Sequence, residues 1–267
     1  MSVLAVIPAR YASSRLPGKP LVELAGKPMI QHVWERTRRA AKVSRVVVAT
    51  EDERILRAVE QFGGEAVMTR AEHRSGTERV AEVAAGAAGR EAEILVNVQG
   101  DEPLIDPAAV DAAVELLLAD SSAQVGTLAV PITRLSDVMD PNVVKVVLDF
   151  EGNALYFSRA PIPWIRGEFP PPSGPHSGTS SSRNAAVLSH LKHLGLYVFR
   201  REALLEFVTF PQGELEKLEQ LEQLRWLENG YQIRVAETTY DSVSVDVPDD
   251  VPRVEALLRD RAAAQSS

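Results

Sequence analysis

The sequence predicts an α/β fold in which a mostly parallel sheet is flanked by helices and carries a small antiparallel subregion. First, short apolar runs alternate with helical stretches over roughly 130 residues, which is typical of strand–helix–strand units with right-handed crossovers. Second, the pattern changes to that of a hairpin after Pro141. Third, the chain is 45% hydrophobic and 25% charged, which is typical of globular proteins and excludes fibrous and disordered classes. Its 267 residues suffice for one large domain or two small ones.

The parallel strands are predicted from short, almost wholly apolar runs, the first of which is stopped by Pro8. These runs cover residues 3–7, 46–48, 94–96 and 127–130. Helices are predicted between them over residues 29–41, 53–61 and 77–88. A fourth helix opens with Asp106 as N-cap and Pro107 as its first residue.

The second half of the chain is predicted to begin with an antiparallel hairpin, residues 143–148 and 154–157 around a turn at 151–153. The segment 167–182 is rich in Pro, Ser and Gly and is predicted to be a mobile surface loop, extending to about residue 189. The remaining predicted elements are strands 193–199, 233–237 and 243–245, and helices 202–208, 215–229 and a terminal helix to about 261. A leucine stripe on helix 215–229 is predicted to be buried: Leu215, Leu218, Leu221, Leu224 and Leu227.

Composition excludes several classes of function. The net charge of −8 argues against a protein that coats nucleic acid, so any anionic ligand needs a local basic cluster. The absence of cysteine excludes disulfides, thiolate catalysis and Cys-based metal sites, and fits a cytoplasmic protein. Neither a signal peptide nor an apolar run of membrane-spanning length is present, so no membrane association is expected.

A basic loop follows the first predicted strand. Residues 10–19 contain Arg10, Arg15 and Lys19 together with hydroxyl groups and a glycine. In open α/β sheets ligands bind beyond the carboxyl ends of the strands, and cations with backbone N–H groups there suit a polyphosphate. The loop matches neither a Walker A motif nor a dinucleotide-binding fingerprint, and an ordinary solvated turn is the alternative.

Two carboxylates are predicted at strand exits, Asp101 after the run 94–96 and Asp246 after the run 243–245. Together they would suit Mg²⁺, which takes one or two carboxylates and completes its shell with phosphates and water. The alternative is that each aspartate forms a turn or caps a helix. The five histidines lack the spacing of metal ligands, and no Gly-x-Ser-x-Gly motif supports a hydrolase triad.

Nine segments resemble the CMP-Kdo synthetases, also called 3-deoxy-manno-octulosonate cytidylyltransferases. They cover residues 6–21, 26–29, 75–79, 97–103, 141–147, 156–160, 193–197, 221–225 and 245–246, and so span nearly the whole chain. Other nucleotidyltransferases share the basic loop in looser form. The combination of that loop with the Tyr-Phe-Ser-Arg and His-Leu-Gly-Leu-Tyr segments is specific to this family.

The resemblance implies a role for each of the following groups of residues. The CTP triphosphate would be held by Arg10, Ser13, Arg15 and Lys19. The cytosine pocket would be lined by Arg70, Ala71, Ser75 and Gly76. Asp101 and Asp246 would bind Mg²⁺, and with Arg10 and Lys19 they would form the catalytic set. The acceptor sugar would lie against Gln99, Lys145, Arg159, His193, Tyr197, Glu222 and Gln223, with Arg159 or Lys145 on its carboxylate.

The resemblance also implies a single Rossmann-like nucleotidyltransferase domain over residues 1–267, in which residues 133–200 form a sugar-binding and dimerisation excursion. The implied reaction converts CTP and 3-deoxy-D-manno-octulosonate (Kdo) to CMP-Kdo and pyrophosphate, in the cytoplasm, for lipopolysaccharide synthesis. A homodimer is implied as well. Two alternatives stay open: a cytidylyltransferase for 8-amino-Kdo or a sialic acid, and a nucleotide sensor that has lost turnover.

Overall fold

The computed structural model describes residues 1–13, 15–166 and 190–265, with side chains to residue 261. The predicted mobile loop at 167–189 lies outside the described residues. The strands of the main sheet are β1 (Val3–Ala9), β4 (Arg45–Thr50), β5 (Glu65–Met68), β6 (Ile94–Asn97), β7 (Val125–Pro131), β8 (Lys145–Leu148), β9 (Ala154–Ser158), β10 (Leu191–Arg200) and β11 (Ile233–Glu237). A short hairpin joins β2 (Glu23–Leu24) to β3 (Lys27–Pro28).

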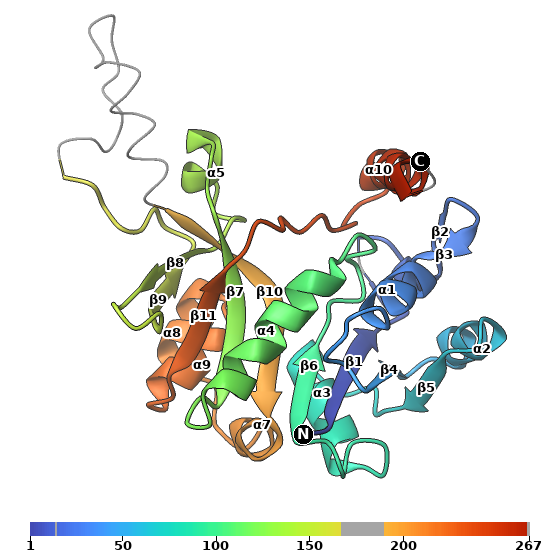
Figure 1. Cartoon of the computed structure of the whole chain (residues 1–267), viewed down its shortest axis with the longest axis horizontal. Helices are drawn as coiled ribbons and strands as arrows, with labels where there is room; N and C mark the ends of the chain where they lie inside the picture. The colour runs from blue at the N-terminus through green and yellow to red at the C-terminus, as the bar shows by residue number, and fades with distance from the viewer. Residues whose placement is uncertain (14, 167–189, 266–267) are drawn as a thin grey trace, which may run out of the picture.

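The main sheet has the order β11-β7-β10-β6-β1-β4-β5, and the β8–β9 hairpin extends it beside β10 (Figure 1). β1 is parallel to β4 and β6, β4 to β5, and β7 to β11. β10 runs antiparallel to both β6 and β7, so those two strands point the same way. The carboxyl ends of the six parallel strands therefore lie at one edge of the sheet.

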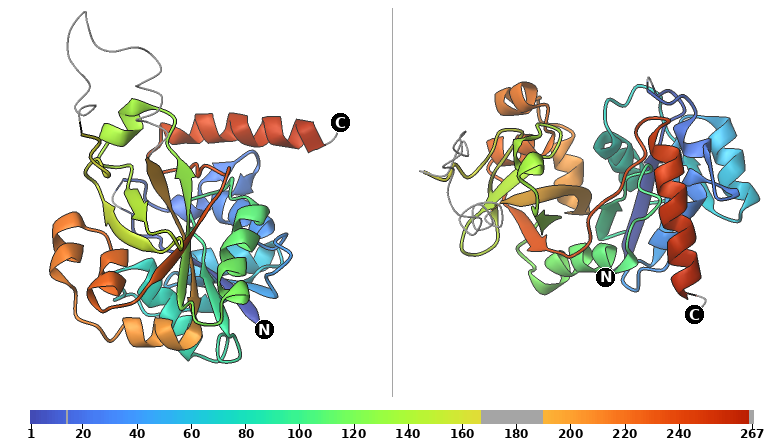
Figure 2. Two further views of the ribbon diagram at one scale, coloured as in Figure 1. Left: turned by 60° about the vertical axis from the view of Figure 1, so that its left-hand side comes forward. Right: turned by 90° about the horizontal axis from the view of Figure 1, so that it is seen from above.

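Helices cover both faces of the sheet (Figures 1 and 2). One face packs against α1 (Met29–Thr37), α2 (Glu53–Gln61) and α4 (Pro107–Ala119). The other packs against α3 (Gly76–Ala85), α7 (Arg201–Phe207) and α9 (Gln223–Glu228). Further elements are a 3-10 turn η1 (Lys19–Leu21), α5 (Leu135–Met139), α8 (Glu214–Glu219) and α10 (Asp250–Gln265). Among the described residues, no helix combines the length and the apolar character needed to cross a bilayer.

The α/β prediction is confirmed. α4 begins after the predicted Asp106 cap with Pro107 as its first residue. α2 occupies the predicted residues 53–61 and begins after Asp52, whose carboxylate accepts the Arg54 N–H. The predicted antiparallel excursion after Pro141 is the β8–β9 hairpin, in which Gly152 takes the positive φ of 83° that its turn requires.

The prediction of one leucine-striped helix over 215–229 is wrong. Gln220 takes a left-handed φ of 52° and divides the segment into α8 and α9. The break turns Leu218 to solvent, 80% exposed, and leaves Leu215 38% exposed, while Leu221 and Leu224 are buried. The periodicity did not show the break because Gln is a good helix former.

The predicted strand at 243–245 is also not a strand. This segment crosses the carboxyl edge of the sheet as extended chain, and the Val245 N–H donates to the carbonyl of Asp101 at 3.0 Å. The apolar alternation reflects burial of Val245 beneath α10, together with Leu24 and Val254.

The edge strand β5 was not predicted. It has only four residues, of which Ala66, Val67 and Met68 are apolar, and so short a run does not stand out in the sequence.

Candidate active site

The basic loop closes on itself directly after β1. Gly18 adopts a φ of 69°, and its N–H donates to the Tyr11 carbonyl at 2.9 Å. The Tyr11 N–H donates to Glu51 Oε1 at 3.1 Å, and the Arg54 guanidinium lies 3.3 Å from the centre of the Tyr11 ring. The loop is therefore held by the residue that follows β4 and by α2, so its cations are anchored beside the sheet.

A cavity of about 330 Å³ lies between this loop and the exit of β6. It is lined by Pro8, Ala9, Arg10, Ala12, Ser13, Arg15, Lys19, Pro20, Gln99, Gly100 and Asp101. Arg10 donates to the carbonyl of His73, and Ser13 Oγ accepts the Leu16 N–H at 3.3 Å. Three cations and a hydroxyl thus face one space, an arrangement suited to a chain of phosphates. We call it the basic-loop cavity.

Asp101 and Asp246 converge on one cation, although 145 residues separate them in the sequence. Lys19 Nζ lies 2.6 Å from Asp101 Oδ2 and 3.1 Å from Asp246 Oδ1, and Arg15 lies 2.9 Å from the same Asp246 oxygen. Burial alone would raise the pKa of Asp246, but Lys19, Ser244 and Arg15 outweigh burial and lower it. The Asp246 carboxylate is therefore ionised at neutral pH and can hold a cation.

The backbone before Asp101 fits tightly against β1. A Cβ on Gly100 would lie 2.7 Å from the Pro8 carbonyl oxygen, closer than real Cβ atoms approach, so only glycine fits at this position. The close approach brings the Asp101 carboxylate to the mouth of the basic-loop cavity. Among the described residues, no group of three or more potential His, Cys, Asp or Glu metal ligands occurs. Two carboxylates beside a cavity suited to phosphates nevertheless fit Mg²⁺, because its remaining ligands would be phosphate oxygens and water.

A second, larger cavity of about 710 Å³ opens beside the first, over the side of β10 that faces α9. Side chains alternate along a strand, so His193, Gly195 and Tyr197 share one face of β10. The other lining residues are Gly76, Thr77, Asn97, Gln99, Asn142, Val143, Val144, Arg159, Lys192, Gln220, Leu221, Glu222, Gln223, Ser242, Ser244 and Asp246. We call this space the β10 cavity.

The aromatic floor of the β10 cavity is buried. The His193 ring lies 5.0 Å from that of Phe157 and 5.3 Å from that of Tyr197, and burial lowers the pKa of His193 to about 3. His193 is therefore neutral at physiological pH, with Nε2 3.1 Å from Thr127 Oγ1. The Tyr197 hydroxyl and Asn97 Oδ1 are buried, and neither has a hydrogen-bond partner among the described residues. Unpaired buried polar atoms in a cavity wall point to a ligand that pairs with them.

The polar wall of the β10 cavity comes from the turn that leads into α9. Thr77 donates to Glu222 Oε2, and burial raises the pKa of Glu222 despite this hydrogen bond. Gln223 is also buried. Gln99 lines both cavities and is fixed by a 2.8 Å hydrogen bond from its amide to the Gly195 carbonyl.

Two residues expected at the sugar are held by the backbone. The Lys145 ammonium is fully buried and donates to three carbonyls, those of Asp140, Val143 and Arg159, at 2.6–2.9 Å. It does not line the β10 cavity. Arg159 does line it, with its guanidinium donating to the carbonyls of Glu219 at 2.7 Å and Pro141 at 2.9 Å.

The residues expected at cytosine lie around the start of α3. Ser75 caps this helix by accepting the Glu78 N–H at 3.2 Å, and Gly76 lines the β10 cavity. Arg70 and Ala71 lie in the segment between β5 and α3 and line neither cavity. The structure thus brings together, at one edge of the sheet, the residues expected at the phosphates and those expected at the acceptor except Lys145, and it leaves Arg70 and Ala71 outside both cavities.

Several lining residues were not predicted. Asn97 ends β6 and lies opposite Tyr197 in the register of β6 and β10, and its place as the polar end of an apolar run was the available signal. Ser244 lies two residues before Asp246 and donates to it at 3.1 Å. Lys192 precedes His193, but no sequence signal singled it out.

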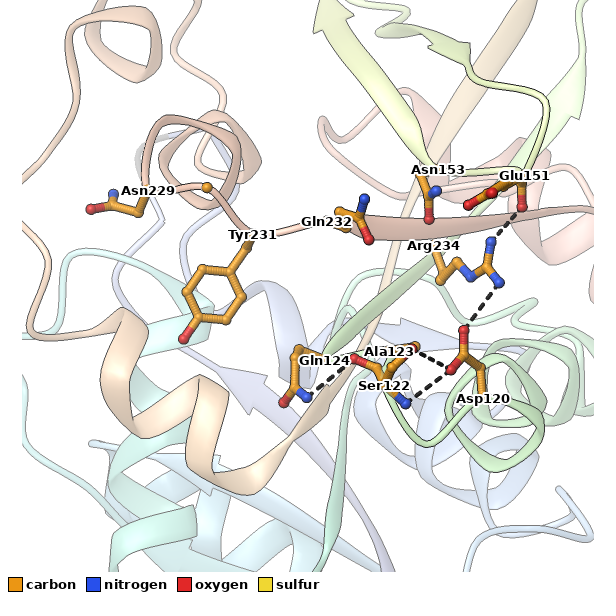
Figure 3. A pocket seen from close by; sticks show the side chains of 11 residues that line it. Asp120, Ser122, Ala123, Gln124, Glu151, Asn153, Asn229, Tyr231, Gln232 and Arg234 are labelled. Carbon is orange, nitrogen blue, oxygen red and sulfur yellow. Dashed lines mark hydrogen bonds and ion pairs between the residues drawn. The ribbon is translucent and has the colours of Figure 1, made fainter.

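A third cavity of about 400 Å³ lies at the opposite edge of the sheet, where β7 and β11 begin (Figure 3). Its only cation, Arg234, lies 3.0 Å from Asp120 Oδ2 and donates to the carbonyl of Glu151 (Figure 3). The Arg234 guanidinium therefore already has partners within the protein, whereas the Tyr197 hydroxyl and Asn97 Oδ1 of the β10 cavity have none among the described residues.

Comparison with known proteins places the chain in a family. The sequence profile of a family described as cytidylyltransferase matches residues 4–234. The 3-deoxy-manno-octulosonate cytidylyltransferase of Geotalea daltonii is 53% identical over 98% of this chain and 100% of its own length, and that of Syntrophotalea carbinolica is 54% identical over 97% and 99%. The chain belongs to the 3-deoxy-manno-octulosonate cytidylyltransferase family. The resemblance seen in the sequence is thereby confirmed.

Solved structures agree with this family membership. A CMP:2-keto-3-deoxy-manno-octonic acid synthetase complexed with CTP matches 98% of the chain and 100% of its own, with a TM-score of 0.87 and 41% identity. The 4-diphosphocytidyl-2C-methyl-D-erythritol synthase of Anaerococcus prevotii matches with a TM-score of 0.59 and 12% identity, over 97% of this chain and 98% of its own, and shares the fold.

Proposed function

We propose that this chain transfers the CMP group of CTP to the anomeric hydroxyl of Kdo and releases pyrophosphate. The observation that carries the proposal is the Lys19–Asp246 ion pair of 3.1 Å, because Lys19 lines the basic-loop cavity and Asp246 lines the β10 cavity. A phosphate chain and a sugar acid in the two cavities would meet at this pair. The names of the relatives at 53–54% identity support CTP and Kdo as the two substrates.

The nucleotide half of the site acts through charge and position. Arg10, Ser13, Arg15 and Lys19 would hold the triphosphate, with Lys19 leaving its carboxylate partners for the phosphates. Asp101 and Asp246 would hold Mg²⁺, which supplies positive charge to the oxygens that become negative as the pyrophosphate leaves. We assign cytosine to the rim formed by Arg70, Ala71, Ser75 and Gly76, on the basis of the family resemblance.

The acceptor half of the site orients a polyhydroxylated acid. The Tyr197 hydroxyl, Gln99, Glu222 and Gln223 provide donors and acceptors for sugar hydroxyls, and His193 supports Tyr197 through ring contact. We assign the sugar carboxylate to Arg159, which lines the cavity and keeps two of its five N–H groups after donating to three backbone carbonyls. Lys145 has all three of its N–H groups used by backbone carbonyls. The anomeric hydroxyl is then directed in line at the α-phosphorus, so the protein contributes positioning and electrostatic stabilisation.

We further propose a single domain, a homodimer and a cytoplasmic reaction that feeds lipopolysaccharide synthesis. Exposed apolar side chains on the predicted excursion 133–200 support dimerisation through it: Phe150, Leu155 at 62% and Trp164 at 59% exposure. The lack of cysteine supports the cytoplasm, where thiol chemistry is not needed for stability.

The test is pyrophosphate release with each of the four nucleoside triphosphates against Kdo, 8-amino-Kdo and a sialic acid. Turnover is expected only with CTP, Kdo and a divalent cation together. Equal turnover with ATP would refute the nucleotide assignment, and faster turnover with 8-amino-Kdo or a sialic acid would refute the choice of acid. Tight CTP binding without pyrophosphate release under any condition would identify a sensor.

A further inference from the structure

A separate basic cavity of about 260 Å³ lies between α1 and α10, outside the two cavities of the active site. It is lined by Ala25, Lys27, His32, Glu35, Arg36, Arg39, Leu258, Arg259 and Arg261. Figure 1 shows α10 above α1 and near the β2–β3 hairpin, and α10 contacts β2. The packing of Leu258 and Val254 against Leu24 and Met29 fixes α10 there, so the cavity is built by the fold.

The charges of this cavity are unbalanced. Its single carboxylate, Glu35, is bound by Lys27 at 2.8 Å, and Arg259 lies 3.6 Å from Glu255. Arg36, Arg39 and Arg261 have no carboxylate within ion-pair distance among the described residues. Three unpaired guanidinium groups in one cavity stand out in a chain whose net charge is −8.

Arg261 and Arg39 lie close enough to Arg36 to repel it. Burial lowers the pKa of Arg36, and the charges of Arg261 and Arg39 lower it further, against smaller opposing effects of Asp106 and Tyr240. Arg36 and Arg261 donate one hydrogen bond each, to the carbonyls of Ile105 at 2.6 Å and Leu104 at 3.0 Å. Most of their N–H groups are left over, and Arg39 makes no side-chain hydrogen bond to any described residue. A bound anion would relieve the repulsion and use these donors.

The size of the cavity limits the ligand. Drug-sized molecules need about 300–1,000 Å³, so a space of about 260 Å³ suits a smaller anion. Guanidinium groups match phosphate oxygens in pairs, and several of them favour a multiply charged group. We infer that this cavity is a binding site for a small phosphate anion, either inorganic phosphate or pyrophosphate. The site is distinct from the nucleotide site, and its existence does not depend on the proposed function.

The site is connected to both metal-binding carboxylates. Leu104 and Ile105, whose carbonyls accept from Arg261 and Arg36, lie on the segment that begins with Asp101. Asp250, at the start of α10, accepts the N–H of Asp246 at 2.8 Å. An anion that ties α1 to α10 would thus restrain both segments that carry the carboxylates.

The test is calorimetric titration of the full-length protein. The protein is saturated with CTP, so that the basic loop is occupied, and divalent metal and acceptor are left out. Inorganic pyrophosphate and inorganic phosphate are titrated separately into the parent, Arg39→Gln, Arg261→Gln and the control Arg38→Gln. Arg38 precedes Arg39 on the same helix end but lies over the Trp34 ring, 5.2 Å from its centre, and does not line the cavity.

The parent and Arg38→Gln are expected to bind one anion with equal affinity, and Arg39→Gln and Arg261→Gln to bind it about tenfold more weakly or worse. Tighter binding of pyrophosphate than of phosphate would identify the reaction product as the ligand, and equal binding would identify a monophosphate site. Failure of both anions to bind at millimolar concentration, or equal affinity in all four proteins, would overturn the inference. Because Arg39 has no side-chain contact to lose, its variant stays informative even if Arg261→Gln fails to fold.

Discussion

Replacement of Asp246 by Asn tests the proposed Mg²⁺ site of Asp101 and Asp246. The substitution removes one negative charge and keeps the shape of the side chain. In the structure the Asp246 carboxylate lies 3.1 Å from Lys19 and 2.9 Å from Arg15. Loss of one preorganised electrostatic contact to the transition state commonly lowers the turnover number by about 10²–10³-fold. We expect a loss of that size in pyrophosphate release with CTP and Kdo.

The same substitution should have little effect on stability. The Asp246 side chain is 37% exposed and its Arg15 partner 64%, so solvent screens the pairs. Exposed ion pairs are worth about 0–1 kcal/mol, and 1 kcal/mol shifts the Tm of a chain of this size by roughly 2–4 °C. A large loss of activity with a small loss of stability is therefore the signature of a functional carboxylate.

The assay is steady-state pyrophosphate release combined with a thermal melt. The matched control is Asp249→Asn on the same segment, since Asp249 is exposed and makes no hydrogen bond or ion pair with the described residues. The reasoning is refuted if Asp246→Asn retains turnover within tenfold of the Asp249→Asn control. A collapse of the Tm in Asp246→Asn would show that the carboxylate is structural.

Three further outcomes follow from buried charges. Lys145→Met should lower the free energy of unfolding in urea by about 2–4 kcal/mol, because three carbonyls lose their donor, while the KM for Kdo stays within twofold; a rise in that KM without destabilisation would contradict the structural role. Glu216→Ala should cost about 3–5 kcal/mol by leaving Arg225 buried without its 2.6 Å carboxylate partner, and an unchanged urea midpoint would count against it. Burial raises the pKa of Glu102 to about 7 from its ordinary 4.5, so the folded state binds the proton more tightly than the unfolded chain. The stability of the parent relative to Glu102→Gln should therefore fall by up to about 1.4 kcal/mol per pH unit as the pH rises from 4.5 to 7, and a pH-independent difference in urea titrations would disprove the shift.

Local signals predicted most of the fold. Continuous apolar runs identified β1, β4, β6 and β7, and the predicted cap at Asp106 marks a helix start that the structure reproduces. Prediction failed where tertiary contacts override periodicity. The left-handed Gln220 breaks a segment that reads as one helix, and burial under α10 gives residues 243–245 the alternation of a strand without a neighbouring strand to pair with.

In the candidate site too, some residues could be predicted from local sequence signals and others depend on tertiary contacts. The basic loop and Asp101 follow from charge at the exits of β1 and β6, which the sequence displays. Asp246 was singled out from an apolar alternation that is not a strand in the structure. The convergence of Asp101 and Asp246 on Lys19 could not be predicted, because it depends on how the segment after β11 crosses the sheet. Asn97 was missed for a similar reason, since only the pairing of β6 with β10 brings it opposite Tyr197. The basic cavity between α1 and α10 joins residues more than 200 positions apart and leaves no local signal.

The central claim is that phosphates and sugar acid occupy two neighbouring cavities, and Tyr197→Phe tests it most directly. The Tyr197 hydroxyl is buried in the wall of the β10 cavity with no described partner, so its removal should leave the Tm unchanged or raise it, because an unpaired buried group costs about 1–3 kcal/mol. If the acceptor supplies the missing partner, the KM for Kdo should rise about three- to tenfold while the KM for CTP stays within twofold. Equal changes in both KM values, or a fall in the Tm with no change in the KM for Kdo, would contradict the account.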